Sequence, residues 1–195
     1  LNDYLPLTGT VTILAGQTFA DIDVTVLNDT IVEATETVVV TLTGFGPHDP
    51  GVSLDLTPAN VTATVDITDN DVATFTINNV STNESAGTLV FDLETDKPLD
   101  IVTVIDVTFT DGSATGGGID YTSTTQHITF LAGQTTAQVI VPINDDSIVE
   151  ATETFSVALG TPTPLDGRAI NVSDTGIGTI FDNDTATVSI AAITA

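Results

Sequence analysis

The sequence predicts an all-β protein built from tandem immunoglobulin-like β-sandwiches. Short segments rich in Val, Ile, Thr and Phe alternate with turn residues along all 195 residues, a pattern typical of strands, and no segment has a convincing helical period. Two strings also recur at one spacing of 117 residues, LAGQT at 14–18 and 131–135 and VEATET at 32–37 and 149–154. A period this long indicates tandem domains rather than a solenoid of short repeats.

The strands predicted in the second copy of the repeat match those predicted in the first. In the first copy we expect four strands, at Thr10–Ile13, Ala20–Val26, Thr37–Leu42 and Val61–Thr68. Their counterparts in the second copy are His127–Phe130, Ala137–Ile143, Thr154–Leu159 and Gly176–Phe181. Three further strands precede these counterparts, at Ala73–Val80, Gly87–Leu93 and Val102–Phe109. About seven strands in one unit suit an immunoglobulin-like sandwich with Greek-key connections.

A second sequence match places the repeat boundaries. The segment Asp71–Ile77 (DVATFTI) resembles Asp184–Ile190 (DTATVSI), which lies 113 residues later. We therefore assign residues 1–71 to the C-terminal part of one repeat, here called the partial repeat. Residues 72–184 form the complete repeat, and residues 185–195 are expected to be the first strand of a further repeat. On this assignment we expect the native polypeptide to extend beyond both ends.

The charge balance restricts the partners of the chain. The formal net charge is −25, because Lys97 and Arg168 are the only basic residues beside 27 Asp and Glu. Cations are the natural partners of such a chain, whereas nucleic acid and anionic membrane surfaces need Lys and Arg. There is no Cys, and no apolar run reaches the roughly 18 residues that span a bilayer, so we expect no direct membrane insertion. The two His residues do not recur between repeats, and we expect no enzymatic activity.

The acids of the complete repeat fall in four places that a sandwich can bring together. Loops at one end of a sandwich lie close together, although they are far apart in the sequence. Many carboxylates in one place repel one another unless cations neutralise them. Oxygen ligands without His or Cys favour a hard cation, and Ca²⁺ over Mg²⁺ because Ca²⁺ accepts six to eight irregular ligands. The acids are Glu84; Asp120; Asp145, Asp146, Glu150 and Glu153; and Asp182 and Asp184.

These motifs together resemble the Calx-beta domain family, first described in sodium–calcium exchangers and common in large bacterial surface proteins. The resemblance covers the whole of residues 72–184, and its motifs are specific as a set although each alone is weak. The matching segments are Asn83–Thr88 (NESAGT), Asp111–Ala114 (DGSA), Gly118–Tyr121 (GIDY), Phe130–Gln134 (FLAGQ), Asp145–Thr154 (DDSIVEATET) and Ile180–Asp184 (IFDND).

The resemblance implies a calcium cluster, with more than one ion in a complete repeat. The implied ligands of the complete repeat are Glu84, Asp120, Asp145, Asp146, Glu150, Glu153, Asp182 and Asp184, and Asn183 offers a carbonyl oxygen where an acid often stands. In the partial repeat the implied ligands are Asp3, Asp29, Glu33, Glu36, Asp69 and Asp71, with Asn28 in the place of Asp145. Calx-beta domains can also keep the fold and lose the ions, in which case these acids are ordinary solvated residues.

The predicted function is that of a calcium-binding structural segment in a large extracellular protein. We expect a bacterial cell-surface adhesin, including the filamentous kind used in gliding motility, in which calcium stiffens the junctions between neighbouring repeats. An unknown surface or glycan ligand would be bound by other regions. Two alternatives stay open: a calcium-sensing regulatory domain of a membrane transporter, and a non-catalytic stalk of a secreted enzyme.

Overall fold

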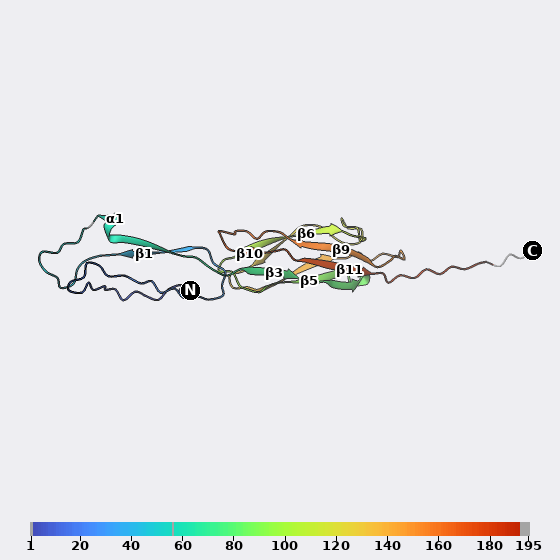
Figure 1. The fold of residues 1–195 in the computed structure, drawn as a ribbon. Coiled ribbons are helices and arrows are strands. Elements are labelled where there is room, and N and C mark those ends of the chain that lie inside the picture. Colours follow the sequence, from blue (N-terminus) through green and yellow to red (C-terminus); the bar gives the residue numbers. More distant parts are fainter. Residues whose placement is uncertain (1, 56, 192–195) are drawn as a thin grey trace, which may run out of the picture.

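The computed structural model describes residues 2–55 and 57–191. Nearly all regular structure in them is β-strand, which confirms the predicted fold class. The molecule is elongated, with the partial repeat at one end and the sandwich of the complete repeat next to it (Figure 1). An extended C-terminal segment leaves the far end of the sandwich.

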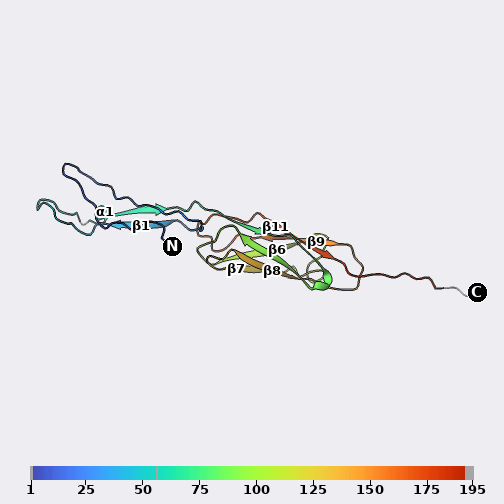
Figure 2. The same ribbon diagram turned by 90° about the horizontal axis from the view of Figure 1, so that it is seen from below.

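The complete repeat is a sandwich of two sheets (Figures 1 and 2). The first sheet has the order β10-β3-β5-β8, with bounds Ile170–Asn171, Ala73–Ile77, Thr88–Thr95 and Thr136–Pro142. The second sheet has the order β4-β11-β9-β6-β7, with bounds Val80–Asn83, Thr175–Phe181, Glu153–Leu159, Thr103–Asp111 and Gln126–Phe130. Buried side chains from both sheets form one continuous core, as sheet-on-sheet packing requires.

The core follows from the alternation of apolar and polar residues along the strands. Every second residue of β5 is buried, and β9 alternates in the same way. Phe91 of β5 meets Phe155 of β9 edge to face, with ring centroids 6.1 Å apart, and Tyr121 stacks on Phe155 at 4.0 Å. The Tyr121 hydroxyl donates a hydrogen bond to Asp111 Oδ1 at 2.6 Å, so its polar group is satisfied.

The strand predicted over Ala73–Val80 is two strands in different sheets. The chain leaves β3 at Asn78 and Asn79 and enters the other sheet as β4. The side chains of both asparagines accept a hydrogen bond from the backbone of a neighbouring strand. The Asp92 amide of β5 donates to Asn78 Oδ1 at 2.8 Å, and the Ile177 amide of β11 donates to Asn79 Oδ1 at 2.7 Å. The switch matters for the site because it places β4 parallel to β11.

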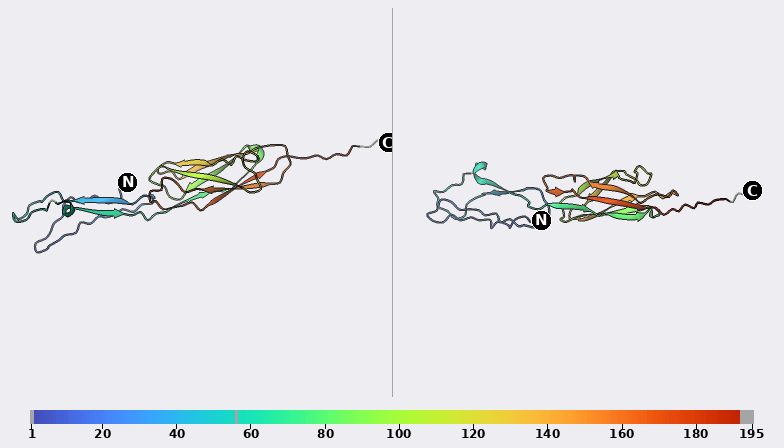
Figure 3. Two further views of the ribbon diagram at one scale, coloured as in Figure 1. Left: turned by 90° about the horizontal axis from the view of Figure 1, so that it is seen from above. Right: turned by 45° about the vertical axis from the view of Figure 1, so that its right-hand side comes forward.

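The partial repeat keeps the last strand pair of the fold (Figure 3). Its strands pair antiparallel with Glu36 opposite Ile67, the register that Glu153 and Ile180 have in the β9–β11 pair. This strand pair therefore has the same register in both copies. The regular elements of the partial repeat are β1 (Glu36–Thr41), α1 (Pro58–Val61) and β2 (Thr62–Ile67).

Two strands predicted in the partial repeat, Thr10–Ile13 and Ala20–Val26, are wrong. The structure assigns no strand to either segment, and only an isolated bridge joins Tyr4 to Val26. Their counterparts β7 and β8 pair with β6 and β5, and the residues that the structure describes include no equivalents of β5 and β6 for the first repeat. A groove of about 640 Å³ lies open on this side. Among the apolar side chains that line the groove are Leu5, Val11, Ile22, Val39 and Leu42.

The first strand of a further repeat, predicted over 185–195, does not form in the part of this segment that is described. Residues 185–191 carry no strand assignment, and residues 192–195 lie outside the described residues. Val188 and Ile190 are 94% and 97% exposed. The physical reason is the same as in the partial repeat: a strand needs a neighbour, and no described strand pairs with this segment.

The helices of the described residues are single turns. They are α1 and a 3₁₀ helix, η1, at Glu84–Ala86. No helix in the described part of the chain is long and apolar enough to cross a membrane.

Candidate metal centre

The topology brings the four acidic segments to one end of the sandwich. Parallel strands β4 and β11 end side by side, with Phe181 opposite Asn83, so Glu84 and Asp182 follow at the same edge. Strand β9 runs antiparallel to β11 and begins there, with Glu153 opposite Ile180. The loop between β8 and β9, which carries Asp145, Asp146 and Glu150, therefore ends at this edge. Asp120 lies between β6 and β7, and its carbonyl accepts the Asn144 amide of this loop at 2.9 Å.

One group of carboxylates joins the segment after β4 to the segment after β11. Glu84, Asp182 and Asp184 each place an oxygen within 4.8 Å of the others. Glu84 is only 4% exposed, and its Oε1 accepts a hydrogen bond from the Asn183 amide at 3.2 Å. Burial raises the pKa of Glu84, and this hydrogen bond partly opposes the rise.

Asp182 organises the loops around this group. Its Oδ1 accepts the Asp184 amide at 2.8 Å, and its Oδ2 accepts the Glu150 amide at 2.8 Å. These two backbone hydrogen bonds lower the pKa of Asp182, which therefore stays ionised beside the other acids. One side chain thus ties the β8–β9 loop to the end of β11.

A second group lies against the first and consists of Asp120, Glu150 and Glu153, again with oxygens within 4.8 Å of one another. Burial, together with the charge of Asp120, raises the pKa of Glu153 to about 7. Burial also raises the pKa of Glu150, and the charges of Asp146 and Asp120 add to the effect. Carboxylates held this close without a cation repel one another, so each favours the protonated form of its neighbour.

The remaining predicted ligands flank these two groups without joining either of them. Asp146 Oδ1 accepts the Ile148 amide at 2.6 Å, and the Asn183 side-chain amide donates to Asp145 Oδ1 at 3.4 Å. The charges of Asp145 and Asp146 nevertheless contribute to the raised pKa of Asp184. All nine predicted residues of the complete repeat are therefore at one end of the sandwich, six of them in two tight groups.

One atom shows that the arrangement fits a bound cation. Asp184 Oδ2 is buried and has no hydrogen-bond partner among the described residues. A buried, unpaired carboxylate oxygen is costly unless a positive group meets it. The donors around it are oxygens of Asp, Glu and Asn side chains, the ligand type that hard divalent cations take.

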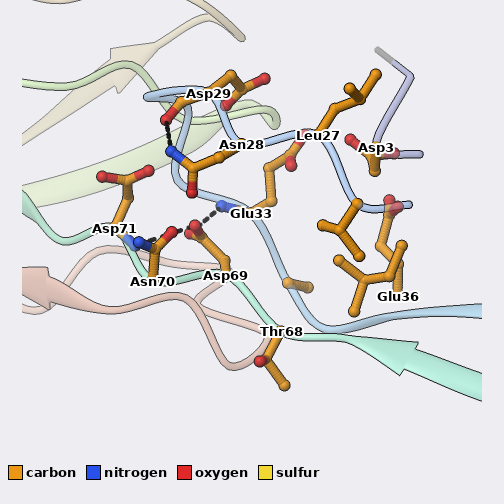
Figure 4. A pocket seen from close by; sticks show the side chains of 13 residues that line it. Asp3, Leu27, Asn28, Asp29, Glu33, Glu36, Thr68, Asp69, Asn70 and Asp71 are labelled. Atoms are coloured by element: carbon orange, nitrogen blue, oxygen red, sulfur yellow. Dashed lines mark hydrogen bonds between the residues drawn. The ribbon is translucent and has the colours of Figure 1, made fainter. Parts of the chain in front are cut away.

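The partial repeat reproduces the hydrogen-bond frame of this site (Figure 4). The Glu33 and Asp71 amides donate to Asp69 Oδ2 and Oδ1 at 2.8 and 3.0 Å, as the Glu150 and Asp184 amides do to Asp182. The Ile31 amide donates to Asp29 Oδ1 at 2.8 Å, the counterpart of the bond from Ile148 to Asp146. The six predicted acids line a cavity of about 40 Å³, namely Asp3, Asp29, Glu33, Glu36, Asp69 and Asp71.

The acids of the partial repeat are arranged more loosely than those of the complete repeat. Within the described residues, no three of them bring oxygens within 4.8 Å of one another. The pKa of Glu33 is still raised to about 7, first by burial and then by the charges of Asp3 and Asp29. The hydrogen bond from Glu36 to Asp3 matches the one from Glu153 to Asp120, and it raises the pKa of Glu36.

The complete repeat contributes a cation to the site of the partial repeat. Lys97 Nζ lies 2.6 Å from Asp71 Oδ1, and Asp71 is the counterpart of Asp184. Arg168, the other basic residue, binds Asp100 through two hydrogen bonds of 2.5 and 2.7 Å, and Asp100 contributes to the raised pKa of Glu33. Neither Lys97 nor Arg168 was predicted to be a neighbour of the site. Their signal was available, because they are the only two basic residues of the chain.

Comparison with known families gives a match along almost the whole chain. A family model described as the Calx-beta domain matches residues 2–71 and 66–185. Rat sodium/calcium exchanger 3 is 27% identical over 177 residues, which is 82% of this chain and 19% of that protein. Zebrafish (Danio rerio) adhesion G-protein coupled receptor V1 is 31% identical over 178 residues, 81% of this chain and 3% of that protein. The chain thus spans a small part of either relative.

Solved structures share the fold of one repeat. The crystal structure of the apo-form Calx CBD1 domain has a TM-score of 0.50 and 18% identity, covering 57% of this chain and 98% of that one. The crystal structure of the calcium binding domain CBD12 of CALX1.1 has a TM-score of 0.51 and 19% identity, covering 58% of this chain and 47% of that one. At this identity the likeness establishes the β-sandwich alone.

Proposed function

The chain belongs to the Calx-beta domain family, and we propose that the acidic end of its complete repeat binds calcium. The observation that carries the proposal is the pair of carboxylate groups at one end of the sandwich, where the buried Asp184 Oδ2 has no hydrogen-bond partner in the described part of the chain. The raised pKa values of Glu84, Glu150 and Glu153, which reflect burial first and neighbouring negative charge second, support the proposal, because a bound cation would offset both costs.

The donor set favours calcium over magnesium. Carboxylates from separate loops form an irregular oxygen-rich site, which Ca²⁺ accepts, whereas Mg²⁺ demands near-octahedral geometry and keeps its waters. Two adjacent carboxylate groups support more than one ion in the complete repeat. The ligands we assign are Glu84, Asp120, Asp145, Asp146, Glu150, Glu153, Asp182, Asn183 and Asp184.

The residues of the chain prepare this site before any ion arrives. Bound calcium would supply the positive charge that neutralises the clustered carboxylates. Asp182 holds the β8–β9 loop and the segment after β11 together through its two backbone hydrogen bonds. Asn183 links Glu84 to Asp145 through its amide groups. Loops that are already tied together lose little conformational freedom on binding, which favours affinity.

In this proposal the chain is a structural segment without enzymatic activity in a large extracellular protein, such as a bacterial surface adhesin. The recurrence of the VEATET string and the contact between neighbouring repeats support an array of repeats. Calcium at each junction would turn repelling hinge carboxylates into a tie between loops and so stiffen the array. Ligand recognition, on a surface or a glycan, would belong to other regions.

A second candidate is a calcium-sensing regulatory domain of a membrane transporter. The likeness to rat sodium/calcium exchanger 3 along 82% of this chain supports it. Affinity separates the two roles, because sensors work at about 10⁻⁷–10⁻⁵ M calcium and extracellular modules at about 10⁻⁴–10⁻³ M. A non-catalytic stalk of a secreted enzyme predicts the same affinity as the adhesin, and the flanking sequence distinguishes these two.

The test is thermal unfolding of the whole chain in millimolar calcium, in equal magnesium and in excess chelator. Calcium at ten to a hundred times Kd should add about 1–3 kcal/mol per site to the free energy of unfolding, and magnesium should add much less. Glu150→Gln should lose most of the gain, whereas the matched control Glu94→Gln, an exposed acid of β5, should keep it. Equal melting in calcium and chelator would contradict the proposal.

A further inference from the structure

Val32 of the partial repeat is buried by the complete repeat. Its side chain is 0% exposed and belongs to the same apolar cluster as Leu99, with which it forms a parallel bridge. The Val32 amide donates to the Pro98 carbonyl at 2.9 Å, and the Asp100 amide donates to the Val32 carbonyl at 3.3 Å. The site loop of one repeat thus pairs with the loop between β5 and β6 of the next.

The counterpart of Val32 in the complete repeat is Val149, and it has no such partner among the residues that the structure describes. Val149 is 51% exposed, and the adjacent Ile148 is 59% exposed. Within the described part of the chain, neither the amide nor the carbonyl of Val149 forms a backbone hydrogen bond. The surrounding sequence is the same, because residues 31–37 and 148–154 both read IVEATET.

The loop around Val149 is nevertheless already shaped like the loop that is paired. Ile148 is fixed by its bond to Asp146, and Glu150 by its bond to Asp182, at 2.6 and 2.8 Å. Ile31 and Glu33 make the same bonds in the partial repeat, where the partner loop is present. The backbone around Val149 is therefore already held in the conformation of the paired loop, which lowers the conformational-entropy cost of docking.

The face that would cover Val149 is equivalent to the face of the complete repeat that covers Val32. The Leu99 carbonyl accepts the Gly133 amide at 2.9 Å, and Arg168 clamps Asp100, so the loop that receives Val32 is held from both sides. Both basic residues of the chain, Lys97 and Arg168, lie at this face, whereas the loop it covers is acidic. The two faces are complementary in backbone hydrogen bonding and in charge.

We propose that Ile148 and Val149 form a docking surface for the β5–β6 loop of a second Calx-beta repeat, equivalent to residues 96–100 of this chain. The surface makes one parallel bridge at Val149 and covers its side chain, as Leu99 does for Val32. This inference rests on the array that the proposed function describes, but the contact itself is made by backbone and apolar groups of the chain. The same loop therefore carries proposed calcium ligands on one side and contacts a neighbouring repeat on the other.

The experiment compares this chain with an extended chain, in which residues 1–184 are followed by a second copy of 72–184. Amide hydrogen exchange of Val32 and Val149 is measured by NMR in calcium. We expect Val32 to be protected in both proteins. Val149 should exchange freely in the present chain and at least about tenfold more slowly in the extended one. Unchanged exchange of Val149 in the extended chain would overturn the inference.

Two variants and a second condition make the result specific. Val149→Ser in the extended chain should loosen the second junction and speed exchange of the Asp100 counterpart in the added copy. Ile140→Ser, an equally exposed residue of β8 at 51%, should not. Repeating the exchange in chelator separates the two proposals: slow exchange of Val149 both with and without calcium supports docking and contradicts calcium-dependent stiffening. Fast exchange of Val149 in calcium contradicts docking, whatever calcium does to stability.

Discussion

The acidic ends of the two repeats share one backbone frame and differ in where a cation would come from. In the partial repeat, Asp71 meets the ammonium group of Lys97 from the next repeat at 2.6 Å. In the complete repeat, Oδ2 of the equivalent Asp184 is buried and has no hydrogen-bond partner among the described residues. The carboxylates are closer together in the complete repeat, where six of them form two tight groups.

Comparison of the two acidic ends separates the features that are local to a repeat from those that depend on its neighbour. The frame of hydrogen bonds around Asp69 and Asp182 is local, because it is the same with and without a following repeat. Charge compensation and burial of the loop depend on the neighbour, as Val32 and Val149 show with 0% and 51% exposure. Variants and solution conditions can change either the local hydrogen-bond frame or the contact with the neighbouring repeat.

The largest effect is expected from breaking the frame. Asp182→Ala removes the acceptor of two backbone hydrogen bonds and a proposed ligand, so the complete repeat should lose its calcium-dependent rise in Tm as well as stability in chelator. Asp69→Ala should also destabilise the partial repeat, but should leave most of the calcium-dependent rise in place. Calorimetric melting of both variants in calcium and in chelator checks this. An equal loss of the calcium response in both would contradict the assigned difference between the sites.

The second effect concerns burial at the junction. Val32→Ser should lower the free energy of unfolding by about 2 kcal/mol, since a fully buried Val side chain is worth about 1.5–3 kcal/mol. Val149→Ser should change it little in this chain, because its side chain is half exposed. Urea unfolding of the two variants provides the comparison. If they are equally stable, the junction contact contributes nothing measurable.

The third effect is a dependence on pH without calcium. Glu33 and Glu153 have pKa values of about 7 in the folded chain, above the 4.5 of an ordinary Glu. Between these values the folded state holds protons that the unfolded state has lost, so stability falls as pH rises from about 5 to 7.5. Tm in chelator should therefore be higher at pH 5.5 than at pH 7.5.

Calcium should reverse this order, because it binds the deprotonated carboxylates. The Glu153→Gln variant should flatten the pH dependence in chelator, whereas Glu94→Gln should keep it. A Tm that rises with pH in chelator would show that the clustered acids are not mutually repelling.

The smallest effect is expected from Lys97→Gln. The variant leaves Asp71 without its positive partner, so the junction should loosen in chelator and recover in calcium. Its salt bridge is partly exposed, with the Lys97 side chain 31% exposed, so the change in Tm should be slight. Exchange of the Val32 amide is the more sensitive readout, and Lys97→Arg should restore its protection. No change in this exchange would limit Lys97 to a surface role.

The sequence was informative wherever the pattern is local. Alternation predicted seven strands of the complete repeat, although one of them is two strands, β3 and β4, and β10 was not predicted. The recurring strings predicted that the Glu36 and Glu153 strands would be equivalent. Sandwich topology correctly predicted that distant acids would meet, because parallel β4 and β11 end together.

The features that the sequence did not predict depend on partners far along the chain. The segments Thr10–Ile13 and Ala20–Val26 have strand-like sequences but no neighbouring strand within residues 2–55 and 57–191, so propensity alone was misleading. The change of sheet at Asn78 and Asn79 depends on amides of Asp92 and Ile177, which no local pattern reveals. The junction likewise depends on pairing between Val32 and Leu99 of different repeats.

Calcium binding at the acidic end of the complete repeat is measured by calorimetric titration of the whole chain, with Glu150→Gln/Glu153→Gln as the site variant and Glu94→Gln as the control. We expect saturable calcium binding in the wild type and the control, and a lower number of bound ions in the site variant. Equal magnesium should not compete. A wild type that binds no calcium, or a site variant that binds as many ions as the control, would contradict calcium binding at these carboxylates.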